Sequence, residues 1–294
     1  VVAQLHLLLQ VLFTFIDLQE VVMSHLGKFN FKKIILLAGL PRTGSTLLSN
    51  ILAQNKIFYI EGNSALCQLM WDAKQSCDIT AAQQLKGNNK LKLVKNNILK
   101  SIPNSYYPNT SDKIIIDKCR PWVSLPNMKI AKEYIDPNIK TIIAVRPLDE
   151  VVASYAKILF NNGHKEDVYD NLLSVTNETI IGSFTSTYYA ANQKNNNNYF
   201  FYSYDKLVND TPNLLKNLYT FLDIKNYNHK LTEIKQTVFE NDSFYNLKGM
   251  HDIRKTIEIQ KNPVVLPEWV KIKCDEMTLA LYSKIEENNY GTFC

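Results

Sequence analysis

The stretch LLAGLPRTGSTLLSNIL, residues 36–52, joins two runs of different hydrophobic pattern through a turn that glycines flank. Residues 34–38 are continuously apolar, which is typical of a strand buried on both faces of a parallel sheet. Apolar residues then recur at helical spacing within 46–54. The stretch therefore predicts a strand, a turn from Gly39 to Ser45 and a helix, in that order.

Four further short apolar runs predict strands at 56–60, 113–116, 141–145 and 199–202. Helical patterns separate them, including helices with polar connectors over 64–100 and a helix over 148–159. Strands that alternate with helices favour an α/β fold: a three-layer, P-loop-like architecture with a central parallel sheet flanked by helices. Another helix is predicted to start with Thr211 as N-cap and Pro212 in the first helical position. The last 70 residues predict only helices and loops on that core.

The chain shows no linker, so residues 23–294 are expected to form a single domain. Residues 1–22 are apolar, but Asp17 interrupts them and they lack the basic start of a signal peptide. Met23 opens a stretch that resembles a protein start. We therefore expect residues 1–22 to be a non-native segment or an extra helix, and no stable membrane span. Membrane association through this segment is the alternative.

The amino-acid composition limits the classes of function that the chain can have. The chain has 294 residues, 46% of them hydrophobic and 21% charged, as in a globular enzyme. A net charge of +5 suits an anionic ligand in a cleft, but is too diffuse to indicate nucleic acid. Five scattered cysteines without a CxxC pair favour free thiols and a cytoplasmic location. Pairing of Cys67 with Cys77 would be the alternative for an exported protein.

The turn predicts an anion site. Its backbone N–H groups converge at the N-terminus of a helix, where the helix dipole adds about half a positive charge. Ser45 and Thr46 supply hydroxyl donors, and Arg42 supplies a guanidinium that can hold a tetrahedral oxyanion. In a nucleoside-triphosphatase loop, GxxxxGK[ST], a lysine would stand where this chain has Ser45. The sequence therefore favours an anion smaller than a magnesium-bound triphosphate.

GLPRTGSTLLSNIL resembles the 5′-phosphosulfate loop of sulfotransferases that use 3′-phosphoadenosine 5′-phosphosulfate (PAPS), and most of all the PRSGTT form of tyrosylprotein and related bacterial enzymes. Residues 141–158 resemble that family's 3′-phosphate site, in which Arg146 and Ser154 would grip the phosphate. Here RPLDE stands in place of RDPRD, so a second basic residue is missing. Residues 201–224 resemble a segment that would place Tyr204 near the nucleotide. GMHDIRK, 249–255, resembles a late basic loop and implies a contact from Arg254.

The resemblance implies a sulfotransferase that moves a sulfuryl group in line from PAPS to a hydroxyl or amine acceptor, releasing adenosine 3′,5′-bisphosphate (PAP). It implies no metal. Arg42 would act on the bridging and leaving oxygens. Lys118 resembles a transition-state lysine, with a surface lysine beside Asp117 as the alternative. Glu61 matches the family's glutamate base, with an ordinary strand-end carboxylate as the alternative. The expected donor-binding residues are Pro41, Arg42, Thr43, Gly44, Ser45, Thr46, Arg146, Ser154, Tyr204 and Arg254.

Two other functions stay open at the level of sequence. A P-loop kinase or NTPase would use Asp117 as the magnesium-binding end of its strand, although the loop lysine is missing. A non-catalytic nucleotide-binding module would keep the fold without the chemistry. The acceptor is expected to be a small molecule, a carbohydrate or a peptide and not a nucleic acid. The sequence indicates neither which of these it is nor the oligomeric state.

Overall fold

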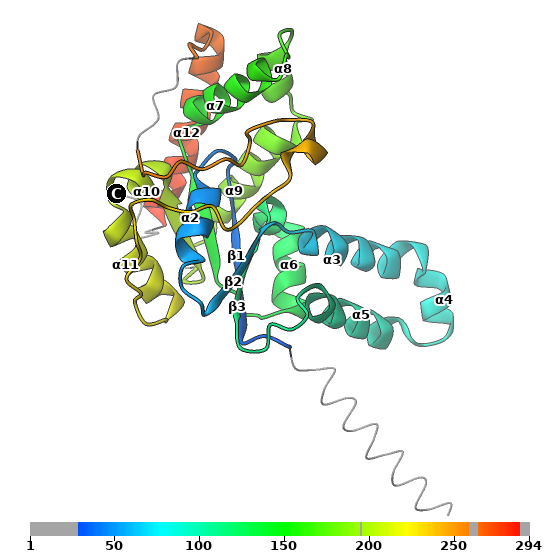
Figure 1. The fold of residues 1–294 in the computed structure, drawn as a ribbon. Coiled ribbons are helices and arrows are strands. Elements are labelled where there is room, and N and C mark those ends of the chain that lie inside the picture. The colour runs from blue at the N-terminus through cyan, green and yellow to red at the C-terminus, as the bar shows by residue number, and fades with distance from the viewer. Residues whose placement is uncertain (1–28, 195, 259–263, 289–294) are drawn as a thin grey trace, which may run out of the picture.

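The structure is a computed structural model that describes residues 29–194, 196–258 and 264–288. The predictions for residues 1–22 lie outside these ranges. A five-stranded parallel sheet forms the centre of the molecule, with strand order β2-β3-β1-β4-β5 (Figure 1). The strands are β1 Lys33–Gly39, β2 Phe58–Asn63, β3 Ile114–Lys118, β4 Thr141–Val145 and β5 Tyr199–Ser203. The predicted α/β fold with a central parallel sheet is confirmed.

Each strand carries apolar side chains on both faces of the sheet, so helices cover both faces. One face packs against α2, α10 and α11, and the other against α3, α5, α6, α9 and α12. A smaller cluster joins α7, α8 and α12. The helix bounds are α2 Ser45–Leu52, α3 Leu66–Gln75, α4 Ala82–Gly87, α5 Leu91–Tyr106, α6 Leu125–Tyr134, α7 Leu148–Asn161, α8 Val168–Leu172, α9 Ser183–Ala191, α10 Tyr204–Asn209, α11 Thr211–Leu222 and α12 Glu268–Glu287.

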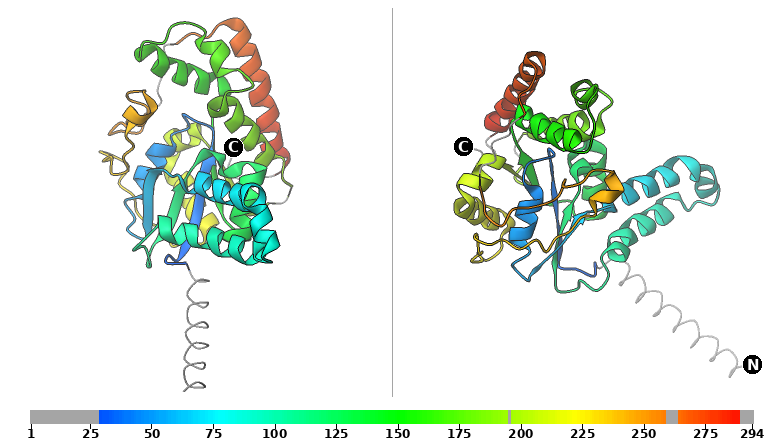
Figure 2. Two further views of the ribbon diagram at one scale, coloured as in Figure 1. Left: turned by 90° about the vertical axis from the view of Figure 1, so that its right-hand side faces the viewer. Right: turned by 45° about the horizontal axis from the view of Figure 1, so that its top comes forward.

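Helices α3, α4 and α5 form an arm that projects from one side of the sheet (Figures 1 and 2). A π-helical turn, Ser76–Thr80, joins α3 to α4. Its Asp78 carboxylate lies 2.7 Å from the ammonium groups of both Lys74 and Lys95. The helices predicted over 64–100 are therefore present.

Several element boundaries differ from the predictions. Strand β2 continues to Asn63, so Glu61 lies within the strand and not after it. Strand β3 includes Asp117 and ends at Lys118. Helix α11 has Asp210 as its N-cap, and Thr211 is already helical. The Thr211 hydroxyl donates to the Leu207 carbonyl of the preceding helix at 2.6 Å, which explains why it does not cap its own helix.

Residues 234–258, here called the covering loop, cross over the end of the sheet where the strands terminate (Figures 1 and 2). The loop contains one short 3-10 turn, Asp242–Tyr245. Buried Asn50 of α2 anchors it, because its side-chain oxygen accepts hydrogen bonds from the N–H groups of Thr237 and Val238 at 2.6 and 2.9 Å. Gln236 ties the two limbs of the loop together by bonding to the backbone of His251 and Ile253.

Among the described helices, none is both long and apolar enough to cross a membrane. The four cysteines in the described ranges, Cys67, Cys77, Cys119 and Cys274, are free thiols.

Candidate active site

The turn between β1 and α2 has the backbone of an anion cradle. Gly39 has φ of 116°, and a Cβ there would lie 2.2 Å from the Ala144 carbonyl oxygen, so only glycine lets β1 approach β4 this closely. Gly44 and Arg42 also adopt left-handed φ, 74° and 60°. Helix α2 has no side-chain cap and no acidic residue in its first turn. Its first N–H groups are therefore free to bind an anion.

A cavity opens beside this turn, between the turn, α7 and the covering loop. Every donor-binding residue expected from the sequence lines it, and so does Lys118. The structure thus brings together residues separated by more than 200 positions. The expected residues on its wall are Pro41, Arg42, Thr43, Gly44, Ser45, Thr46, Lys118, Arg146, Ser154, Tyr204 and Arg254.

Two arginines meet at one end of the cavity. The Arg146 guanidinium donates to the Arg42 carbonyl at 2.9 Å and to Glu150 at 2.7 Å. Arg42 donates to the Ser154 hydroxyl at 3.2 Å and to the Met250 carbonyl. Burial, and next the neighbouring Arg146, lower the pKa of Arg42. This end therefore has an excess of positive charge that a bound anion would relieve.

Tyr204 and Arg254 flank these arginines. The Tyr204 ring lies 4.0 Å from the centre of the Arg146 guanidinium, a cation–π contact that fixes the plane of the arginine. Arg254 lies on the covering loop with its side chain 55% exposed, and its nearest carboxylate is Glu258 at 3.8 Å. Arg254 thus places an exposed cation at the mouth of the cavity.

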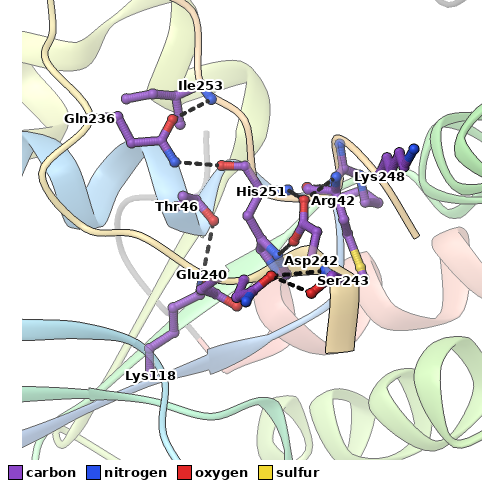
Figure 3. Close-up of polar contacts among 12 residues, drawn as sticks. Arg42, Thr46, Lys118, Gln236, Glu240, Asp242, Ser243, Lys248, His251 and Ile253 are labelled. Carbon is purple, nitrogen blue, oxygen red and sulfur yellow. Dashed lines mark hydrogen bonds and ion pairs between the residues drawn. The ribbon is translucent and has the colours of Figure 1, made fainter. Parts of the chain in front are cut away.

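Lys118 is the cation nearest the start of α2. It is buried at the end of β3, and its ammonium donates to the Thr46 hydroxyl at 3.0 Å and to Glu240 at 2.5 Å (Figure 3). Both side chains of the Lys118–Glu240 pair are almost inaccessible, 7% and 4% exposed. Burial lowers the pKa of Lys118, and Glu240 opposes that effect. The alternative of a surface lysine beside Asp117 is therefore wrong.

Glu240 belongs to a chain of polar groups on the covering loop. His251 Nδ1 lies 2.5 Å from Asp242, whose carboxylate also accepts the N–H groups of Met250 and His251 (Figure 3). His251 Nε2 lies 3.0 Å from Glu240 Oε2. Within the described residues this buried oxygen has no hydrogen-bond donor. Burial lowers the pKa of His251, although Asp242 and Glu240 oppose it. The His251 imidazole thus lies between the carboxylates of Glu240 and Asp242.

Glu61 lies apart from these groups. Its carboxylate is exposed and accepts a hydrogen bond from the Tyr59 hydroxyl. It does not line the cavity that holds Arg42 and Lys118, but an adjacent one on the other side of Glu240. The geometry therefore separates Glu61 from the other residues expected from the sequence.

Asp117 faces the interior of the fold. Its buried carboxylate accepts hydrogen bonds from Ser64 and Tyr107, both at 2.6 Å, and from the Trp122 indole. Burial raises its pKa. These three donors occupy the carboxylate, and it does not line the cavity. The arrangement gives no support to a magnesium-binding role, and hence none to a kinase or NTPase.

Sequence reasoning missed Glu240, Asp242 and His251. They stand in a segment without periodicity, and the contact of Glu240 with Lys118 spans 122 positions. No spacing rule connects residues so far apart. The HD pair within GMHDIRK is a local signal for His251 alone.

Solved structures of sulfotransferases resemble this chain in fold. The sulfotransferase domain of a Synechococcus PCC 7002 olefin synthase is 18% identical, covers 86% of this chain and 96% of its own, and has a TM-score of 0.52. A sulfotransferase from Alicyclobacillus acidocaldarius is 8% identical, covers 88% and 95%, and has a TM-score of 0.51. Mouse sulfotransferase SULT7A1, solved with PAP, is 13% identical, covers 92% and 89%, and has a TM-score of 0.45.

A search of curated proteins finds no match. The family described as "Sulfotransferase domain", however, matches residues 32–289, which is most of the chain and includes every element of the cavity. The chain therefore belongs to the sulfotransferase domain family.

Proposed function

We propose that this sulfotransferase holds PAPS in one orientation, with the 5′-phosphosulfate at the β1–α2 turn and the 3′-phosphate at the arginine pair. PAPS supplies the sulfuryl group, and PAP is the product. The observation that carries the proposal is the pairing of buried Lys118 with Thr46 at 3.0 Å, beside the uncapped start of α2. A cation and helix N–H groups together stabilise charge that develops on phosphate and sulfonate oxygens.

The 3′-phosphate end is built by Arg42, Arg146 and Ser154, and Arg42 contacts both of the others. The lowered pKa of Arg42 and the absence of a carboxylate on that guanidinium in the described ranges support an anion there. This differs from the role on the leaving oxygen that the resemblance implied for Arg42. In the structure Lys118, and not Arg42, is the cation next to Thr46. We assign the leaving oxygen to Lys118 and to the N–H groups of Thr43 to Thr46.

The proton of the acceptor hydroxyl needs a base within reach. We assign this role to the His251–Glu240 pair. Asp242 holds the Nδ1 side of the imidazole, and Nε2 lies 3.0 Å from the Glu240 carboxylate. A proton that arrives there completes a hydrogen bond between the two residues. Glu61 stays the second candidate, because its carboxylate lines the adjacent cavity.

Calorimetric titration tests the donor site. PAP is expected to bind more tightly than ATP with magnesium, and more tightly than adenosine 5′-monophosphate (AMP) because only PAP carries the 3′-phosphate. Arg146→Met and Ser154→Ala are expected to weaken PAP binding about tenfold or more, the loss of one charge-assisted hydrogen bond. Their affinity for AMP serves as the control and should change little. ATP binding more tightly than PAP would refute the proposed function.

A further inference from the structure

A second cavity, of about 470 Å³, lies next to the donor cavity, between β2 and the covering loop. Asn63 lines both cavities. Glu240 lines the second one, while its partners Lys118 and His251 line the first. The Lys118–Glu240–His251 cluster thus forms the partition between them. A molecule in the second cavity therefore lies against the groups that we assign to transfer.

The covering loop and β2 meet closely enough to shape this space. A Cβ at Gly62 would lie 2.3 Å from Glu240 Cγ and 2.9 Å from the Phe239 carbonyl oxygen. The loop therefore rests directly on the strand backbone at Gly62. The two lining segments are held together there and do not merely pass near each other.

The walls of this cavity are aromatic. Phe239, Phe244 and Tyr245 are 70%, 84% and 46% exposed, and Ile60 adds an aliphatic surface from β2. Three large aromatic side chains exposed within seven residues leave apolar area uncovered, which marks a binding surface more often than a structural one. Such walls suit a ligand with an aromatic or aliphatic body.

The charge of the cavity is negative. No lysine, arginine or histidine is among its described lining residues. Lys118 neutralises Glu240, but the described residues place no cation within salt-bridge distance of the Glu61 carboxylate, which accepts only a hydroxyl from Tyr59. A carboxylate or sulfate on the ligand would therefore be repelled, and an ammonium attracted.

We infer that the second cavity binds the sulfate acceptor, and that the acceptor carries its hydroxyl on an aromatic or apolar body without negative charge. The inference rests on the proposed function, because the shared partition matters only if transfer occurs at Lys118. Glu61 then selects the acceptor by its charge, and Phe244 contacts the acceptor body. Acidic peptides and anionic sugars are excluded as acceptors.

Three matched phenols test the charge preference: 4-ethylphenol, tyramine and 4-hydroxyphenylacetate, with PAP release and product mass as readouts. We expect kcat/KM for tyramine to exceed that for 4-hydroxyphenylacetate about tenfold or more, with 4-ethylphenol between them. Glu61→Gln should bring the ratio of tyramine to 4-hydroxyphenylacetate close to one. Equal values for all three phenols in the wild type, or a preference for the carboxylate, would overturn the inference.

Phe244→Ala tests the apolar contact. We expect KM for 4-ethylphenol to rise about fivefold, because a large aromatic contact is lost, while PAP affinity stays unchanged. Leu279→Ala, which removes a 70% exposed apolar side chain on α12, is the matched control and should change neither value.

Turnover of neutral oligosaccharides but of no phenol would disprove the acceptor class while PAP binding persists. Loss of PAP binding by the wild type would instead contradict the proposed function, on which this inference depends.

Discussion

At the scale of single residues, burial decides what each charged group can do. Lys118 and Asp117 are neighbours in sequence and point to opposite sides of β3, as alternate residues of a strand do. Asp117 is surrounded by hydroxyl and indole donors in the interior, whereas Lys118 reaches the start of α2 and Glu240. The same alternation within β2 leaves Glu61 exposed. The sequence could place these residues at strand ends but could not show which of them share a cavity.

Replacing the two residues of the proposed base tests their role. His251→Gln and Glu240→Gln are each expected to lower kcat by about 10²- to 10⁴-fold, the usual contribution of a positioned general base. PAP affinity should stay nearly unchanged in the titration. In the wild type, kcat should fall on the acid side with a midpoint below the ordinary histidine value, because burial lowers the pKa of His251.

Glu61→Gln is the comparison variant for that prediction. If Glu61 were the base, its replacement would abolish turnover of every acceptor and retain PAP binding, whereas His251→Gln would stay active. The outcome with 4-ethylphenol, an acceptor without charge, separates the two assignments.

At the scale of secondary structure, the β1–α2 turn and the covering loop are held by close backbone contacts. Gly39 lets β1 lie against β4, and Asn50 fastens the covering loop to α2. The turn was predictable because strand, glycine turn and helix follow within 20 residues. The covering loop was not, because its contacts are hydrogen bonds to distant elements and leave no periodic pattern.

Gly39→Ala should destabilise the whole protein. A Cβ at 2.2 Å from the Ala144 carbonyl, in a left-handed conformation, forces two central strands apart. We expect a loss of about 3 kcal/mol or more in the free energy of unfolding, measured by urea denaturation. Gly87→Ala is the matched control: it lies in α4 with no atom within 4 Å of the added Cβ. It should stabilise the protein by about 0.5 to 1 kcal/mol. Equal effects of the two substitutions would contradict the packing described.

At the scale of the whole molecule, the donor cavity lies at the carboxyl ends of the parallel strands, where the covering loop crosses the sheet. Such an edge is the usual position of ligand sites in open α/β sheets. Two apolar layers, one on each face, hold the strands in register. Partly buried polar groups within these layers make the stability of the fold depend on pH.

His229 provides a test of this dependence outside the cavity. It is partly buried, its Nε2 lies 2.9 Å from the Tyr219 hydroxyl, and burial lowers its pKa. The unfolded chain therefore binds a proton more readily, and the stability contributed by neutral His229 is present above pH 6.5 and lost as the pH falls through its folded pKa. Relative to His229→Gln, the wild type should lose up to about 1.4 kcal/mol per pH unit below pH 6.5. Urea denaturation of both proteins between pH 7.5 and 5 measures this difference, and parallel pH profiles would refute it.

The sequence by itself determined the order of strands and helices and the position of the glycine turn between β1 and α2, and it placed Arg146 at the end of β4 and Ser154 two turns along α7. These features depend on backbone periodicity and on residues close together in the chain, so local spacing is enough to indicate them. Only the tertiary structure decided that Lys118 is buried against Glu240, that His251 and Asp242 join them, and that Glu61 faces a second cavity. Those contacts form across more than a hundred residues, and the folding of the covering loop onto the sheet edge, not any pattern within the loop, brings them together.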